Sequence, residues 1–206
     1  GFFMAKYKMH PFISTMANML IIFGLVTYAT KGVSFGAIDS SIPNMFIPTF
    51  GSFPSIILWA IVAIIVVWFI WNKTTFGKNM FAVGSNPEAA NVSGVNVMRT
   101  TILVHTLAGC MYGITGFIES ARIGSNQANT GLNYECDAIA ACVIGGVSFV
   151  GGTGKISGVV LGVFILRIIF VALQFLAVSQ NMQYVIKGLI ILIACAIDMR
   201  KYLVRK

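Results

Sequence analysis

Long apolar runs dominate the chain, and short polar segments separate them. Several runs reach about 18 or more residues without a charged side chain, which is the length a helix needs to cross a hydrocarbon core of about 30 Å. The runs do not alternate between apolar and polar positions, so they favour helices over the strands of a barrel. Because lipid cannot satisfy backbone hydrogen bonds, we predict an all-α integral membrane protein, a polytopic helical bundle.

The runs predict about six membrane segments in this chain, one of them short. The fourth would rise only about 20 Å as a helix. It therefore either extends through Gly154, tilts little, or is a broken or re-entrant piece buried by its neighbours. In chain order the predicted segments are Phe12–Ala29, Phe53–Trp71, Thr100–Ile118, Ala138–Val150, Ile156–Val178 and Met182–Ile197.

The composition agrees, with 57% hydrophobic and 10% charged residues, more apolar than a soluble domain of this length. Basic residues lie near both ends and in the loop after the second segment, so these parts are the cytoplasmic candidates. The anionic inner leaflet then accounts for the net charge of +8, and nucleic acid is not needed as a partner. These basic residues are Lys6, Lys8, Lys73, Lys78, Arg99, Arg200, Lys201, Arg205 and Lys206.

The polar loop at residues 72–99 carries the start and stop signals of a short helix. An asparagine suited to the N-cap precedes a proline and a glutamate, both of which favour the first turn. Two alanines propagate the helix, and a glycine fits the position just after its end. The residues of this predicted helix and its caps are Asn86, Pro87, Glu88, Ala89, Ala90 and Gly94.

So short a helix is marginal alone in water, so it must pack on something. One interpretation is a helix that lies on the membrane surface or caps the bundle. The other is a helix that docks into a groove of another protein.

Three stretches resemble permease subunits of bacterial ABC importers for monosaccharides of the ribose, xylose and galactose type. They are FGKNMFAVGSNPEAANVSGVNV (Phe76–Val97), KMHPFISTMANML (Lys8–Leu20) and YECDAIAACVIGGVSFVGGTGKISGVVLG (Tyr134–Gly162). The resemblance covers essentially the whole chain and is strongest to the galactose and methyl-galactoside permeases. Family members extend further at the N-terminus, so the chain resembles the C-terminal portion of one transmembrane permease domain that occupies residues 1–206, with residues 72–99 as its coupling loop.

This resemblance implies a multi-pass permease of the bacterial inner membrane with a cytoplasmic C-terminus. It implies a permease homodimer, a cytoplasmic ATP-binding subunit and a periplasmic or lipid-anchored sugar-binding protein. The chain itself would be no enzyme and bind no cofactor, since ATP and Mg would be bound by the partner ATPase. The helix at Pro87–Ser93 would sit in a groove of that subunit and turn its closure into a push on the membrane segments.

Glycine-rich sequences allow two further interpretations. The stretch VGGTGKISG (Val150–Gly158) is no phosphate-binding loop, because Phe149 and Ile156 occupy the positions that need glycine and a hydroxyl. Two small-residue pairs favour close helix packing, either within one subunit or across a dimer interface. They are Gly109 with Gly113, and Gly158 with Gly162.

Polar groups inside the segments are the candidates for a sugar pathway, because neutral sugars are held by hydroxyls, amides and aromatics. Ser14, Thr15 and Asn18 are our pathway candidates, with interhelical hydrogen bonding as the alternative. Arg167 either lines the pathway, pairs with an acid, or has a structural role facing the bundle. His105 has no second ligand nearby in sequence, which argues against a metal site.

Two other classes of protein compete with this interpretation. An ion-coupled secondary transporter would also use broken helices and polar groups at mid-membrane, but it would not need a capped cytoplasmic helix. A membrane-embedded enzyme is less favoured, because no segment carries paired acids, a Ser/His arrangement or metal-ligand spacing.

Overall fold

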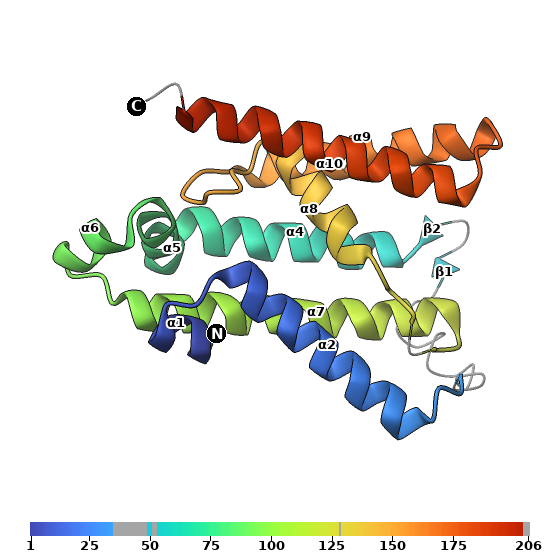
Figure 1. Ribbon diagram of the computed structural model, residues 1–206, viewed down its shortest axis with the longest axis horizontal. Coiled ribbons are helices and arrows are strands. Elements are labelled where there is room, and N and C mark those ends of the chain that lie inside the picture. The colour runs from blue at the N-terminus through green and yellow to red at the C-terminus, as the bar shows by residue number, and fades with distance from the viewer. Residues whose placement is uncertain (35–48, 51–52, 128, 204–206) are drawn as a thin grey trace. The chain divides into compact units, whose positions relative to one another are not determined.

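A computed structural model describes residues 1–34, 49–50, 53–127 and 129–203 (Figure 1). The described part is mainly helical, with one antiparallel pair of two-residue strands in which Phe50 pairs with Phe53. The elements are α1 (Phe2–Tyr7), α2 (Pro11–Thr30), β1 (Thr49–Phe50), β2 (Phe53–Pro54), α4 (Ile56–Lys73), α5 (Thr75–Ser85), α6 (Pro87–Val92), α7 (Val97–Ile123), α8 (Tyr134–Ile144), α9 (Ile156–Phe175) and α10 (Gln180–Leu203).

Among the described residues, 5 helices are long and apolar enough to cross a membrane: α2, α4, α7, α9 and most of α10. This finding confirms the prediction of a polytopic all-α membrane protein. Several of the predicted boundaries move, and the sixth segment is longer at both ends. The second segment starts at Ile56 because Phe53 and Pro54 belong to β2, the third is longer at both ends, and the fifth ends at Phe175 instead of Val178.

The fourth predicted segment needs the largest correction. It was expected over Ala138–Val150, but α8 runs from Tyr134 to Ile144, only 11 residues. The helix stops because the next residues turn the chain: Gly146 has φ +80°, a left-handed conformation that glycine adopts without strain. A non-helical loop then leads to α9. The structure thus excludes a continuous helix through Gly154 and agrees with the alternative of a broken or re-entrant piece.

The loop at residues 72–99 holds two helices where one was predicted. The unexpected one, α5, begins after Thr74, whose Oγ1 accepts a hydrogen bond from the N–H of Gly77 at 3.1 Å. A side chain at Gly77 would collide with the carbonyls of Ile70 and Trp71, so glycine permits the tight turn out of α4. The Thr-Thr pair at the start of this segment was a capping signal that the sequence interpretation missed.

The chain divides into two compact units, the first formed by residues 1–80 and 90–130 and the second by residues 81–89 and 131–206. In the first unit α1 packs against α7 and α2. In the second unit α8 packs against both α9 and α10. The buried centre of the second unit consists of Ala140, Ala141 and Leu166, with Ile144, Phe170, Ile190 and Ile191 packed around it.

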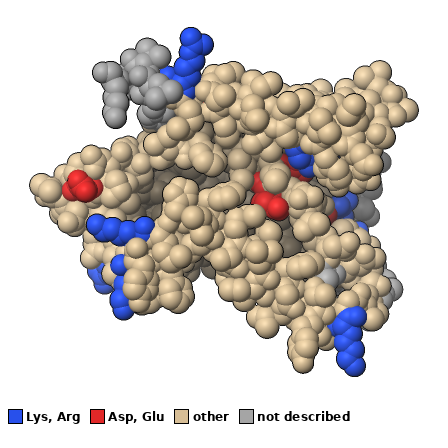
Figure 2. All heavy atoms as spheres, viewed as in Figure 1, with Lys and Arg blue, Asp and Glu red and all other residues tan. Residues whose placement is uncertain are grey.

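Most apolar side chains of α2 and α4 are exposed in this chain, as expected of helices that face lipid or other membrane segments. Figure 2 shows one face of the molecule, on which Lys, Arg, Asp and Glu occupy only a few places.

Candidate functional site

The short helix α6 is capped at both ends. Its first turn is held by Asn86, whose Oδ1 accepts hydrogen bonds from the N–H groups of Glu88 at 2.9 Å and Ala89 at 3.0 Å. At its end Gly94 has φ +83°, and the N–H of Val95 donates to the carbonyl of Ala90 at 3.0 Å. This 6→1 bond around a left-handed glycine is the usual way to satisfy the last carbonyls of a helix. The caps make α6 a defined element despite its 6 residues.

Most of α6 is exposed. Ala90 is the buried residue, at 4% exposure, whereas Glu88 is exposed and Val92 is 90% exposed. The exposed surface of α6 includes the carboxylate of Glu88 and the aliphatic side chain of Val92. That surface can contact another molecule without any rearrangement of the helix.

The residues just before α6 are held by the glycine-rich stretch that follows α8. Ser85 Oγ donates a hydrogen bond to the carbonyl of Gly152 at 3.4 Å. A Cβ added to Gly84 would lie 2.8 Å from the nitrogen of Gly152, so the two backbones are in direct contact. The residues that lead into α6 are therefore fixed by direct contact with the loop after α8, within the second unit.

The three pathway candidates all lie in the first turns of α2. Thr15 Oγ1 donates to the carbonyls of Pro11 and Phe12, both at 3.0 Å, so its hydroxyl is used within its own helix. Ser14 is half-buried, and Thr15 and Asn18 are exposed. Their role in a pathway remains a prediction.

The two glycine pairs have different surroundings. A Cβ at Gly158 would collide with the carbonyl of Gly145, and one at Gly162 would collide with the carbonyl of Ala141. These two glycines therefore let α9 approach the backbone of α8 within one chain. At Gly109 and Gly113 an added Cβ would meet nothing within 4 Å among the described residues.

Lys187, on α10, forms an ion pair with an acid on α8. Its Nζ lies 2.5 Å from Asp137 Oδ1, in the first turn of α8, and the lysine side chain is only 13% exposed. The same Nζ lies 5.2 Å from the centre of the Phe170 ring and 5.6 Å from that of Tyr184. An acid within reach and two aromatic faces hold the ammonium group inside the second unit.

The other charged and ring groups singled out in the sequence have simpler environments. Arg167 is exposed in this chain. Nδ1 of His105 lies 2.8 Å from the carbonyl oxygen of Thr101 in the preceding turn of α7. Within the described residues, no group of at least 3 His, Cys, Asp or Glu side chains could hold a metal ion.

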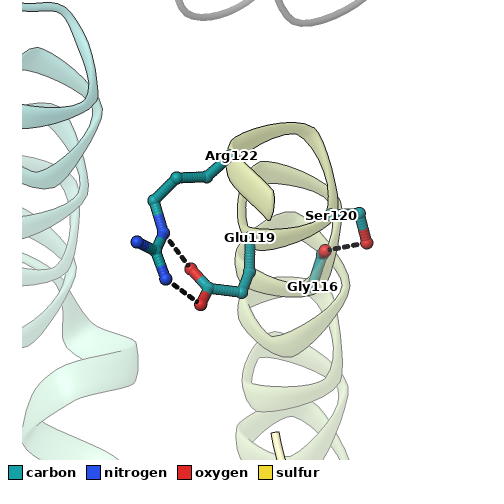
Figure 3. Close-up of polar contacts among 4 residues, drawn as sticks. All are labelled: Gly116, Glu119, Ser120 and Arg122. Carbon is teal, nitrogen blue, oxygen red and sulfur yellow. Dashed lines mark hydrogen bonds and ion pairs between the residues drawn. The ribbon is translucent and has the colours of Figure 1, made fainter. Parts of the chain in front are cut away.

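A second ion pair lies near the end of α7. Arg122 Nε donates to Glu119 Oε2 at 2.9 Å and Arg122 Nη2 to Glu119 Oε1 at 2.6 Å, a two-pronged pair within one helix (Figure 3). Beside it, Ser120 Oγ donates to the carbonyl of Gly116 at 2.7 Å. The acid and the base near the end of α7 therefore pair with each other.

The long apolar helices and the capped, exposed α6 define a polytopic helical membrane protein with a short exposed helix between two of its membrane segments. The chain belongs to the family described as "Branched-chain amino acid transport system / permease component", which matches residues 1–195.

Curated relatives of the chain are sugar permeases, which confirms the resemblance noted in the sequence. The galactose/methyl galactoside import permease protein MglC of Treponema pallidum is 47% identical over 215 residues, which are 100% of this chain and 40% of the relative. The MglC protein of Escherichia coli is 44% identical over 100% of this chain and 63% of its own length. The L-arabinose transport system permease protein AraH of Escherichia coli is 40% identical over 98% of this chain and 61% of its own.

The chain thus spans less than two thirds of the length of these relatives. No solved structure matches it.

Proposed function

We propose that this chain is part of the permease subunit of an ATP-driven sugar importer and forms part of the pathway for a monosaccharide such as galactose or a methyl galactoside. The similarity to import permeases over the whole chain carries this proposal. The permease does no chemistry of its own. Ser14, Thr15 and Asn18 contribute polar groups to the sugar pathway, where weak neutral contacts allow a sugar to enter and leave.

The partners follow from the same proposal. A cytoplasmic ATP-binding subunit binds ATP and Mg, a periplasmic or lipid-anchored protein delivers the sugar, and the permease works as a homodimer. Within the permease, α6 is the docking element for the ATP-binding subunit. Its caps keep it rigid, and its exposed Glu88 and Val92 offer a charge and an apolar contact to a groove.

The proposed membrane is the bacterial inner membrane, with α6 and the C-terminus both in the cytoplasm. Two contacts support a shared side for these parts. Ser85, next to α6, bonds to Gly152 in the loop after α8, and Asp198, near the end of α10, bonds to Phe149 in that same loop. A short α8 followed by the non-helical loop that leads to α9 can then supply the sixth crossing.

The test is co-purification, in detergent, of the complete permease with its candidate ATP-binding subunit, comparing wild type with Glu88→Lys. We expect the reversed charge at the docking surface to reduce capture by roughly tenfold or more, since truncating a central interface residue commonly costs that much. The matched control is Glu119→Lys, the same charge reversal near the far end of α7. It should leave capture unchanged.

Capture of the Glu88→Lys variant at the wild-type level would remove α6 as the docking element. Sugar uptake by sealed vesicles separates the two modes of transport. Uptake that needs internal ATP and survives collapse of the ion gradients supports the importer, whereas uptake that stops with those gradients supports an ion-coupled secondary transporter.

A further inference from the structure

The loop at residues 148–153, between α8 and α9, is held by a carboxylate on α10. Oδ2 of Asp198 accepts hydrogen bonds from the N–H of Phe149 at 2.9 Å and from Ser148 Oγ at 3.1 Å. Ser148 is itself buried, its Oγ accepts from the N–H of Val150 at 3.2 Å, and its own N–H donates to the carbonyl of Thr153 at 3.1 Å. One carboxylate thus fixes a loop that has no regular secondary structure.

The other side of the same loop touches the end of α5. A Cβ at Gly151 would lie 2.9 Å from the carbonyl oxygen of Gly84, and one at Gly152 would lie 2.6 Å from Cα of Ser85. Both loop glycines have positive φ, +107° and +73°, so a larger residue would be strained as well as crowded. The two backbones lie against each other, and the short side chain of Ser85 adds a hydrogen bond to Gly152.

The contact with α5 connects directly to α6. The N–H of Asn86 donates to the carbonyl of Ala82 at 3.1 Å, which continues the hydrogen bonding of α5 up to the cap of α6. A displacement of the first turn of α6 must therefore move Gly84 and Ser85, and these press on the loop at residues 148–153. The loop in turn is joined to α10 through Asp198 and runs directly into α9.

We propose that Asp198 is a positioning residue for transport: it seats the loop at residues 148–153 against Gly84 and Ser85, so that movement of α6 reaches α9 and α10. This inference rests on the proposed function, in which α6 is moved by an ATP-hydrolysing partner. Without Asp198 the loop at residues 148–153 can shift when α6 moves. Less of the movement then reaches α9 and α10. The partner would then still hydrolyse ATP, but each cycle would move less sugar.

The experiment measures galactose uptake and ATP hydrolysis in proteoliposomes that contain the complete permease, its ATP-binding subunit and its sugar-binding protein. Asp198→Ala removes both hydrogen bonds, and we expect the galactose imported per ATP to fall severalfold, because the loop loses the carboxylate that holds Ser148 and Phe149. Asp198→Asn keeps an oxygen that can accept from Phe149, and it should retain most of the wild-type ratio.

A second variant addresses the other side of the loop. Gly84→Ala suits a helix but adds a Cβ 2.8 Å from the nitrogen of Gly152, so it should lower the same ratio even if Asp198→Ala fails to assemble. Its control is Gly188→Ala on α10, where an added Cβ meets nothing within 4 Å in the described part of the chain, and the ratio should not change.

The outcomes separate the two proposals. A wild-type complex without ATP-dependent uptake would overturn the proposed function, and this inference with it. A working wild type whose uptake and hydrolysis fall in parallel in Asp198→Ala and Gly84→Ala would overturn the inference alone, since a purely structural role lowers both rates together. A fall in the ratio in either variant, with Asp198→Asn and Gly188→Ala near wild type, would support it.

Discussion

Helices α7 and α9 each carry two glycines four positions apart, yet the pairs have opposite surroundings. Gly158 and Gly162 on α9 lie against the backbone of α8, where even a methyl group would collide with a carbonyl. Gly109 and Gly113 on α7 have nothing within 4 Å of an added Cβ among the described residues. The spacing therefore indicates that a helix can be approached closely, but not which partner approaches it.

The two ion pairs also differ: one joins two helices, and the other lies within a single helix. Lys187 and Asp137 join α10 to α8, with the lysine side chain 13% exposed. Glu119 and Arg122 belong to a single helix, with the arginine side chain 54% exposed. A pair that bridges two helices and has one largely buried partner influences the packing of those helices, whereas a pair within one exposed helix gains little over hydration.

The largest expected effect comes from filling the glycine contact on α9. Gly162→Val should lower the stability of the complete permease by about 3 kcal/mol or more, because its side chain would be forced into the carbonyl of Ala141. Gly113→Val is the matched control on α7 and should cost less than about 1 kcal/mol, the ordinary helix penalty of a β-branched residue. Thermal unfolding in detergent measures both, and equal losses would mean that the two pairs are equivalent in the assembled protein.

A smaller effect is expected from the bridging ion pair. Lys187→Met should cost about 1–2 kcal/mol, because it leaves the carboxylate of Asp137 without its charged partner. The loss stays moderate because Asp137 is 37% exposed and water replaces part of the interaction. The double variant Asp137→Lys with Lys187→Asp should recover part of the loss in the same unfolding assay. No recovery would show that packing of the lysine stem, and not its charge, stabilises α8 on α10.

The smallest effect is expected at the pair in Figure 3. Arg122→Ala should change stability by no more than about 0.5 kcal/mol, the usual range for a pair one turn apart on an exposed helix. Raising the salt concentration should reduce even this difference, because exposed charges are screened. A loss as large as that of Lys187→Met would contradict the contrast between the two regions and would indicate that Arg122 reaches a second partner in the assembled complex.

The sequence predicted those parts of the fold that depend on properties of neighbouring residues, such as the length of an apolar run or a capping sequence. The length of the apolar runs is enough to predict α2, α4, α7, α9 and α10. The N-cap of α6 could be predicted as well, because an Asn-Pro-Glu sequence favours one local backbone conformation, and the structure has Asn86 in that role.

The parts that escaped prediction depend on contacts between distant residues. The apolar sequence predicted that the fourth segment continues to Val150. In the structure the helix ends at Ile144, and the loop that follows contacts the end of α5 and Asp198. Asp198 itself follows the last residue predicted for the sixth segment. Nothing in its immediate sequence indicates that its partners lie 49 and 50 residues earlier in the chain.

The shortness of α8 has a consequence for how the protein is made. With 11 residues it is too short to partition into the bilayer as an independent helix. Its buried alanines lie against α9 and α10, which are synthesised after it. We therefore expect α8 to reach its final position only once α9 and α10 have emerged from the ribosome and entered the lipid. Nascent chains truncated before α10 should accordingly leave α8 accessible to proteases. A membrane-associated chaperone would have its largest effect during this interval of synthesis, while α8 is unpacked.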